Sequence, residues 1–255
     1  EFRRVLFRSR RDFVLLATMF SGVSFVNSAS AQFNWGRALE AGRNILQSET
    51  ISDSDLRVYF DRLAANSDRQ NQLASSFSPY GQRIAKLSEG LSSYDGLTLN
   101  IRAYISSEVN AFAMANGVIR VYSGLMDRFS DDEIRYVIGH EIGHVQAGHT
   151  KARIQTALRT SALRNAVASA GGTAGDVADS ALGSLFEQVV HAKHSQANEN
   201  EADDRALNFM REKQYPLQAC VSALEKLEGL GGNNASWLST HPSPRERADR
   251  IRAQI

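Results

Sequence analysis

Two histidines and a glutamate fall within five residues, in the order His140-Glu141-Ile142-Gly143-His144. If this segment is helical, His140 and His144 lie one turn apart and face the same side. Two imidazoles in that arrangement can bind one metal ion, and Glu141 beside them can take a proton from the attacking water. The pattern predicts a zinc site with His140 and His144 as ligands and Glu141 as the general base. A chance match on an ordinary amphipathic helix is the alternative.

The residues around this motif favour a helix. Ser130 can cap its beginning, and the acidic residues 131–133 suit the positive end of the helix dipole. Apolar residues then recur at helical spacing from Ile134 to Val145. We expect the metal helix to begin after Ser130 and to run to about residue 150 or beyond.

A catalytic zinc usually has three protein ligands, so a third ligand must come from elsewhere. His149 is one candidate, but on a continuing helix it would lie about 140° around the axis from His144, which favours a second-layer role. The acidic segment 198–204 supplies the other candidate. Glu199 could bind the metal, and Asp203 one turn later could accept the free ring N–H of a ligating histidine. A solvated acidic helix start is the alternative for this segment.

A small sheet is predicted directly before the metal helix. Apolar and polar residues alternate over 97–105, which indicates a half-buried strand. Residues 109–115 and 118–122 predict two further strands, joined at Asn116-Gly117 by a tight hairpin turn. The small sheet would lead directly into the helix that carries the histidines.

The second of these strands is expected to form an edge beside the site. An extended substrate could pair with the free backbone groups of such an edge, which gives binding with little sequence preference. The residues assigned to this substrate-binding edge are Asn110, Ala111, Phe112 and Ala113. An ordinary edge covered by a loop is the alternative.

Helical periodicity accounts for most of the remaining chain. It predicts helices at 34–47, 53–66, 70–91, 197–213, 216–229 and 243–254, and two more within 151–196 around a Gly-rich loop at 171–175. Pro79 is expected to kink or split the helix at 70–91. His191 and His194 are expected to face solvent on a helix. The predicted fold class is α+β, mostly helical with a small three-stranded sheet.

Composition excludes some classes of function. The chain is 42% hydrophobic and 22% charged, which is enough for one globular domain with a substantial core. The net charge is only +1, so no basic surface for nucleic acid is implied. Cys220 is the only cysteine, which excludes an internal disulfide.

The N-terminus has two segments that stand apart from the fold. Residues 1–9 resemble the in-frame translation of a common sequencing adapter and are treated as an artefact, with a genuine basic leader as the alternative. Residues 10–31 combine Arg10-Arg11, a short apolar run and the small-residue exit Ala29-Ser30-Ala31. This pattern is typical of a secretory signal peptide and predicts a periplasmic protein; a retained N-terminal anchor is the alternative.

The segment HEIGH at 140–144, followed by ENEADDRA at 199–206, resembles the zinc metallopeptidase family of the CAAX prenyl protease and HtpX. In that family a distant E-x-x-A-D motif follows HExxH, and its first Glu binds zinc. The segments 110–113, 117–122 and 239–247 also match, so the resemblance covers roughly residues 95–252. The chain lacks the several long apolar spans of membrane-embedded members and is similar to the soluble, exported branch of the envelope proteases LoiP and BepA.

The resemblance implies a zincin-like domain over 94–255, preceded by a helical region at 32–93 that packs on it. One zinc ion per chain would be held by His140, His144 and Glu199. His241 would enter the cleft, either to occupy the fourth zinc position and hold the enzyme off, or to help bind the developing oxyanion together with Arg247. A loop histidine without a role in the site is the alternative.

The function implied is a zinc endopeptidase of the bacterial cell envelope that hydrolyses unfolded or misassembled envelope proteins. Peripheral association with the outer membrane or its assembly machinery is a further expectation, and nucleic acid is not an expected partner. The alternative is a chaperone-like assembly factor that keeps the zinc site and rarely cuts. The intact Glu141 favours the enzyme, because binding alone does not need a base.

Overall fold

The computed structural model describes residues 53–159, 192–231 and 236–255, all of which fall within the unit that begins at Gly36. The predictions for the artefact and signal segments, for a helix at 34–47 and for the Gly-rich loop at 171–175 lie outside the described residues. The proposed boundary between residues 93 and 94 stays a prediction. Within the described residues no helix is long and apolar enough to cross a bilayer.

A small mixed sheet carries one side of the site. Its strand order is β3 (Asn100–Tyr104), β5 (Val118–Tyr122) and β4 (Ala111–Ala113). β3 runs parallel to β5, whereas β4 is antiparallel to β5 and joined to it through the predicted Asn116-Gly117 turn. β4 is therefore an edge strand of this sheet, as the sequence predicts. A separate two-stranded hairpin pairs β1 (Ser93–Tyr94) with β2 (Leu97–Thr98).

The central element is helix α5 (Asp131–Gln146), which carries both histidines of the motif. Its start is the predicted one: Ser130 and Glu133 form a capping box, in which each side chain accepts a hydrogen bond from the backbone N–H of the other residue. Glu133 also accepts hydrogen bonds from Ser222 and Lys226 of helix α10 (Gln218–Leu230), which ties the beginning of α5 to its neighbour.

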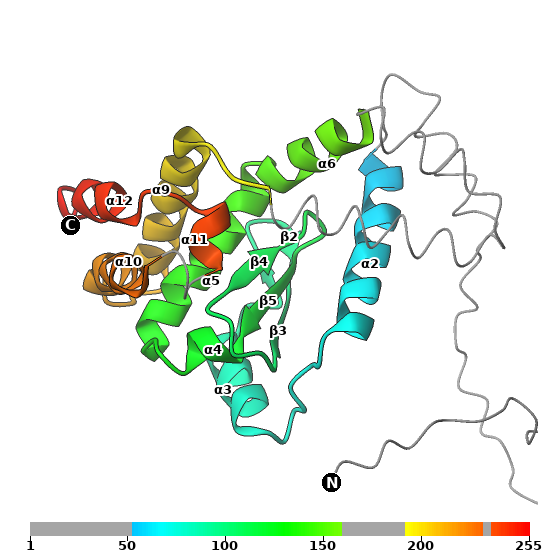
Figure 1. Cartoon of the computed structure of the whole chain (residues 1–255), viewed down its shortest axis with the longest axis horizontal. Helices are drawn as coiled ribbons and strands as arrows, with labels where there is room; N and C mark the ends of the chain where they lie inside the picture. Colours follow the sequence, from blue (N-terminus) through cyan, green and yellow to red (C-terminus); the bar gives the residue numbers. More distant parts are fainter. Residues whose placement is uncertain (1–52, 160–191, 232–235) are drawn as a thin grey trace, which may run out of the picture. The chain divides into compact units, whose positions relative to one another are not determined.

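Figure 1 shows α5 running between the sheet and a group of C-terminal helices. These are α9 (Gln196–Glu212), α10 and α12 (Pro244–Arg252), at the positions that the periodicity predicts. The apolar core extends across all of these layers, from Ile119 and Val121 in β5 through Ile138 in α5 to Leu224 in α10. This arrangement confirms the predicted α+β class.

The remaining described helices are α2 (Asp53–Gln70), α3 (Pro79–Leu87), α4 (Ser123–Met126), α6 (His149–Arg159) and α11 (Trp237–Thr240). The prediction of a helix over 70–91 is wrong for residues 71–78 and 88–91, which are not helical, whereas the expected break at Pro79 is confirmed. Leu73 forms an isolated bridge to Tyr104, and Ala74 N–H donates to the Ala103 carbonyl, so the chain crosses the end of the sheet instead. Pro79 then begins α3, where its missing N–H is not needed.

The metal helix also ends earlier than expected. α5 stops at Gln146, and Gly148 has a left-handed backbone with φ of +70°. Glycine adopts that conformation readily, whereas other residues pay a steric penalty there. The chain therefore turns at Gly148, and α6 begins at His149 in a new direction.

Candidate active site

Side chains from two helices converge on one buried point. His140 and His144 come from α5, and Glu199 comes from the first turn of α9. The His140 and His144 Nε2 atoms lie 3.0 Å apart, and they lie 3.5 Å and 3.3 Å from the two oxygens of the Glu199 carboxylate. The sequence predicts these three residues as metal ligands, and the fold brings them together.

The chemistry of this cluster fits a metal ion. Both Glu199 oxygens are buried; Oε1 has no hydrogen-bond partner among the described residues, whereas Oε2 lies 2.5 Å from Arg247 Nη1. Buried polar atoms without partners are rare in proteins and need an explanation. Two imidazole nitrogens and a carboxylate that face one another are also the donor set of a catalytic zinc site. A cation bound between them would satisfy all of these groups at once. His241 offers a fourth donor atom to the same cluster.

A close approach of two helices makes this convergence possible. A Cβ atom added at Gly143 would lie 2.7 Å from the Ala202 carbonyl oxygen of α9, closer than real side chains pack. At Gly139 an added Cβ would lie 2.6 Å from the Phe209 ring. The absence of side chains at these positions of α5 therefore lets α9 come near enough for Glu199 to reach the histidines.

A buried network lies behind His140. The His140 Nδ1 atom is 2.9 Å from Asp203 Oδ1, which is the contact that the sequence analysis expects for Asp203. Tyr136 also donates to Asp203, at 2.7 Å. Arg247 donates two hydrogen bonds to the same carboxylate, at 2.8 and 2.7 Å, and its Nη1 lies 2.5 Å from Glu199 Oε2.

This placement of Arg247 differs from the oxyanion role expected with His241. The Arg247 side chain is completely buried behind the ligands and holds Asp203 and Glu199 in position. Desolvation raises the pKa of Asp203, but the Arg247 charge and hydrogen bonds outweigh it and hold that pKa well below its usual range. The geometry thus makes Arg247 a positioning residue.

Comparison with known proteins shows what kind of site this is. Residues 82–255, more than half of the chain, match the model of a protein family described as Peptidase family M48. The chain belongs to peptidase family M48. It is a zinc metalloendopeptidase, and the resemblance predicted from HEIGH and ENEADDRA is confirmed.

Two relatives from Escherichia coli (strain K12) extend over most of this M48 chain. The metalloprotease YcaL is 39% identical over 220 residues, which is 86% of the chain and 87% of YcaL. The metalloprotease LoiP is 40% identical over 219 residues, which is 85% of the chain and 87% of LoiP. The mitochondrial metalloendopeptidase OMA1 of Arabidopsis thaliana is 30% identical over 169 residues, which is 66% of the chain and 34% of OMA1.

The two motif histidines of this M48 site differ in pKa although both are buried. Desolvation and the Arg247 charge lower the pKa of His140, but the hydrogen bond with Asp203 and the nearby Glu199 carboxylate outweigh them and raise it to about 9. Desolvation is also the largest influence on His144, and because Glu199 compensates only in part, the pKa of His144 falls to about 3. At neutral pH the metal-free site therefore holds an extra proton on His140 and none on His144.

The predicted base, Glu141, lies in a closed environment. Its side chain is 2% exposed, and its Oε1 accepts a hydrogen bond from the Trp237 indole N–H at 3.2 Å. Burial raises the pKa of Glu141. A raised pKa makes the carboxylate a stronger proton acceptor, which suits a general base.

His241 lies directly beside this base. Its ring stacks on the Trp237 ring with centroids 4.2 Å apart and planes 2° from parallel, and Thr240 Oγ1 lies 2.8 Å from its Nδ1. The Nε2 atom lies 3.5 Å from Glu141 Oε1 and has no hydrogen-bond partner among the described residues. The residues of α11 thus direct His241 into the site, in agreement with the expectation that it enters the cleft.

Two further histidines surround His144. The expectation that His194 faces solvent on a helix is wrong: His194 lies just before α9, is 5% exposed and stacks on the His144 ring with centroids 3.9 Å apart. A backbone hydrogen bond from His194 to Thr240 holds it there, a long-range contact with no local sequence signal. His149 Nδ1 lies 2.9 Å from His144 Nδ1, on the side away from Glu199. His191 lies outside the described residues.

The edge strand β4 is less open than a bare edge. The residues predicted to bind substrate, Asn110, Ala111, Phe112 and Ala113, are all buried. The Asn110 side-chain oxygen accepts from the Ala111 backbone N–H at 2.9 Å, and the Thr150 hydroxyl lies 3.4 Å from the Ala113 carbonyl. The substrate-binding role of this edge stays a prediction.

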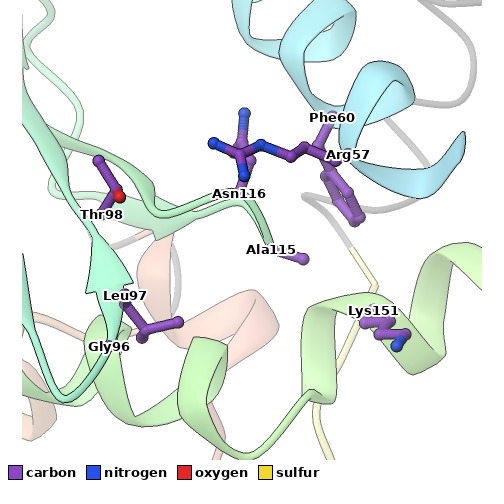
Figure 2. A pocket seen from close by; sticks show the side chains of 8 residues that line it. All are labelled: Arg57, Phe60, Gly96, Leu97, Thr98, Ala115, Asn116 and Lys151. Atoms are coloured by element: carbon purple, nitrogen blue, oxygen red, sulfur yellow. The ribbon is translucent and has the colours of Figure 1, made fainter. Parts of the chain in front are cut away.

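A surface pocket of about 260 Å³ lies elsewhere in the fold (Figure 2). Its walls come from α2, the β1–β2 hairpin, the turn between β4 and β5, and α6. The lining residues are Arg57, Phe60, Gly96, Leu97, Thr98, Ala115, Asn116 and Lys151. None of these is a predicted site residue, so the pocket does not coincide with the buried metal cluster.

Proposed function

We propose that this M48 peptidase cleaves unfolded or misassembled proteins of the bacterial cell envelope. The observation that carries the proposal is the convergence of His140, His144 and Glu199 around one buried point, with Glu141 beside them. One zinc ion per chain, held by these three residues, would supply Lewis-acid activation of the attacking water and of the scissile carbonyl.

Glu141 moves the proton in this scheme. Its carboxylate takes a proton from the attacking water and passes it to the amine of the departing peptide. The hydrogen bond from Trp237 and the nearby His241 both lie at Oε1, so they orient the carboxylate. The raised pKa of Glu141 suits the first of these steps, because it makes the carboxylate a stronger proton acceptor.

The surroundings of His241 favour the first of the two roles that the resemblance implies, in which this histidine blocks the active site. Its free Nε2 belongs to the same donor cluster as the three ligands, and the stacked Trp237 ring leaves Glu141 only 2% exposed. A substrate reaches Glu141 only if α11 and His241 move. We propose that the described conformation is the closed form of the enzyme.

Substrate binding along β4 explains why unfolded chains would be preferred. An extended segment can pair through its own backbone with a strand edge, whereas a folded protein has no free extended segment to offer. The Asn110 and Thr150 contacts at that edge would be exchanged for contacts with the substrate. This mode needs little side-chain specificity, which suits a quality-control protease.

We infer the location from residues 10–31, whose charged start, short apolar run and small-residue exit are typical of a secretory signal peptide. Export would place the enzyme in the periplasm, where misassembled envelope proteins are the available substrates. Peripheral association with the outer membrane or its assembly machinery belongs to the same proposal.

The test is digestion of unfolded casein by the full chain loaded with zinc, with metal content measured in parallel. Glu141→Gln should slow cleavage about 100- to 10,000-fold while zinc remains bound, because only the base is removed. Glu246→Gln, an exposed change of the same chemistry on α12, serves as the matched control and should leave the rate unchanged. Measurable and equal cleavage by the wild type and Glu141→Gln would refute the assignment of the base, whereas no cleavage by either would favour a binding factor or a latent enzyme.

A second function is favoured by the closed site. A chaperone-like factor that keeps its zinc and rarely cuts would also bury Glu141 beneath Trp237 and His241. His241→Ala separates the two: an enzyme held closed should digest casein faster after this change. A binding factor should stay inactive and should suppress aggregation of the unfolded substrate equally well with Glu141 or Gln at position 141.

A further inference from the structure

The second ring nitrogen of His144 has a partner of its own. The His144 Nε2 atom faces Glu199, whereas its Nδ1 atom lies 2.9 Å from the Nδ1 atom of His149. Both rings are buried, with His144 1% and His149 8% exposed. A contact of this length between two ring nitrogens is a hydrogen bond, and one of the two atoms must carry the proton.

Metal binding decides which atom that is. If His144 binds the metal through Nε2, the neutral imidazole carries its proton on Nδ1 and donates it to His149. His149 Nδ1 is then the acceptor, so the neutral His149 ring carries its proton on Nε2. That Nε2 atom lies 3.4 Å from Glu201 Oε2. Each ring N–H along the path from His144 through His149 to Glu201 therefore points away from the metal.

We propose that His149 is a positioning residue for the metal site, which sets the tautomer and orientation of His144, and that Glu201 supports His149 from the protein surface. The inference rests on the proposed function in one respect, namely that His144 is a metal ligand. His149 would do for His144 what Asp203 does for His140. One helix, α9, then supplies the ligand Glu199 and carboxylates that support both histidines.

Glu201 is the weaker part of this path. Its side chain is 49% exposed, and its other oxygen, Oε1, is 2.9 Å from Arg205 Nη2. The distance of 3.4 Å to His149 is longer than a normal N–H···O hydrogen bond. Solvent competes for a half-exposed carboxylate of this kind and screens its charge, so Glu201 should contribute less than His149.

A second metal ion held by His144, His149 and His194 is the competing explanation of the same cluster. It is disfavoured because a neutral His144 ring that binds metal through Nε2 keeps its proton on Nδ1, and a second ion at Nδ1 would have to displace that proton. The Arg153 guanidinium also contacts His194 Nε2, and this positive charge repels a cation. The close approach of the His144, His149 and His194 rings is therefore better explained by hydrogen bonding and stacking than by a second metal ion.

The test compares zinc affinity, measured by competition with a chromophoric chelator, across four variants of the full chain. His149→Phe keeps a ring but removes the acceptor and should weaken zinc binding about 10- to 100-fold. His149→Asn keeps an acceptor at the δ position and should restore most of the affinity. Glu201→Gln should weaken binding less than about fivefold. Asp204→Asn, at a half-exposed carboxylate on the same helix that pairs with Arg250, is the matched control and should have no effect.

Cobalt(II) substitution provides a readout that a merely structural role would not move. The visible absorption of the cobalt protein should change in His149→Phe and remain near wild type in His149→Asn. Zinc affinity of His149→Phe within about threefold of wild type, with an unchanged cobalt spectrum, would overturn the proposal. Stoichiometric binding of a second zinc ion, lost in His149→Phe, would replace it by the two-ion explanation. Undiminished zinc binding by His144→Ala would instead refute the ligand set of the proposed function.

Discussion

The two histidines of the motif are one helical turn apart, yet the protein supports them in opposite ways. Behind His140 lies a fully buried carboxylate, Asp203, held by two hydrogen bonds from a fully buried arginine. Behind His144 lies a neutral ring, His149, whose own partner is a half-exposed carboxylate. One side of the site is a closed ionic network, and the other is a short path to the surface.

The difference shows how one metal site can be both firmly built and adjustable. A buried charged network has few alternative arrangements, because breaking any contact leaves a desolvated charge without a partner. A path through a neutral ring to a screened surface charge costs much less to rearrange. We therefore expect the His140 side to define the site and the His144 side to tune it. Four predictions test this contrast, beginning with the largest effect.

Removal of the buried arginine should cost the most. Arg247→Met leaves Asp203 and Glu199 buried without their counter-charge, which should lower the free energy of unfolding of the metal-free protein by about 3–5 kcal/mol. Urea denaturation measures this difference. Arg250→Met is the matched control: Arg250 pairs with Asp204 near the surface and should contribute less than about 1 kcal/mol. Similar losses in both variants would remove the basis of the contrast.

Loss of the carboxylate behind His140 should follow. Asp203→Asn keeps the shape of the side chain but weakens the acceptor for His140, and should weaken zinc binding about 10- to 100-fold. The change should exceed that of Glu201→Gln, the corresponding carboxylate on the His144 side, when both are measured by chelator competition. A larger effect at Glu201 would reverse the order of the two sides.

The pH dependence of zinc binding should report His140 alone. The pKa of His140 is raised to about 9, so below that pH zinc must displace its proton, whereas His144, with a pKa of about 3, is already neutral. The logarithm of the zinc association constant should therefore fall by about one for each unit of pH decrease between about pH 8.5 and 6. Proton release, measured by calorimetry in buffers of different ionisation enthalpy, should be close to one. A value near two would show that both rings are protonated in the metal-free site.

The turn at Gly148 should give the smallest effect. Gly148→Ala places a side chain at a φ of +70°, and the strain should cost about 1–2 kcal/mol although there is open space around it. If this change also weakens zinc binding, the cause would be a displaced His149, which no longer supports His144. Gly229→Ala is the control, because Gly229 is helical with open space around it and should gain about 0.5–1 kcal/mol. Equal thermal stability of Gly148→Ala and the wild type would argue against strain at the turn.

The sequence predicted best what local chemistry determines. The capping box at Ser130, the Asn116-Gly117 hairpin and the position of Glu199 relative to Asp203 each depend on residues a few positions apart. The convergence of Glu199 with the histidines could not be derived from spacing, because the chain between α5 and α9 is long. It came from the family resemblance, which carries tertiary information that a single sequence does not show.

Two of the errors share one cause: the predicted helix continues past the residue that ends it. Periodicity was extended through residues 71–78, where the chain instead pairs with the end of the sheet. The predicted metal helix also continues through Gly148, where the chain turns instead; the second-layer role expected of His149 nevertheless agrees with its contact with His144. A glycine near the end of a helical pattern followed by a histidine was the available signal. The buried environments of Arg247 and His194 arise from contacts between distant segments and have no local signal.

The close approach of α5 and α9 also assigns a role to a glycine of the HEIGH motif. Three of its five residues would take part in metal binding or proton transfer. The glycine at position 143 contributes by having no side chain, because any side chain there would collide with the Ala202 carbonyl. Catalytic geometry in this protein is thus encoded partly by the lack of atoms. An enzyme engineered onto another pair of helices would need this gap as much as it needs the histidines.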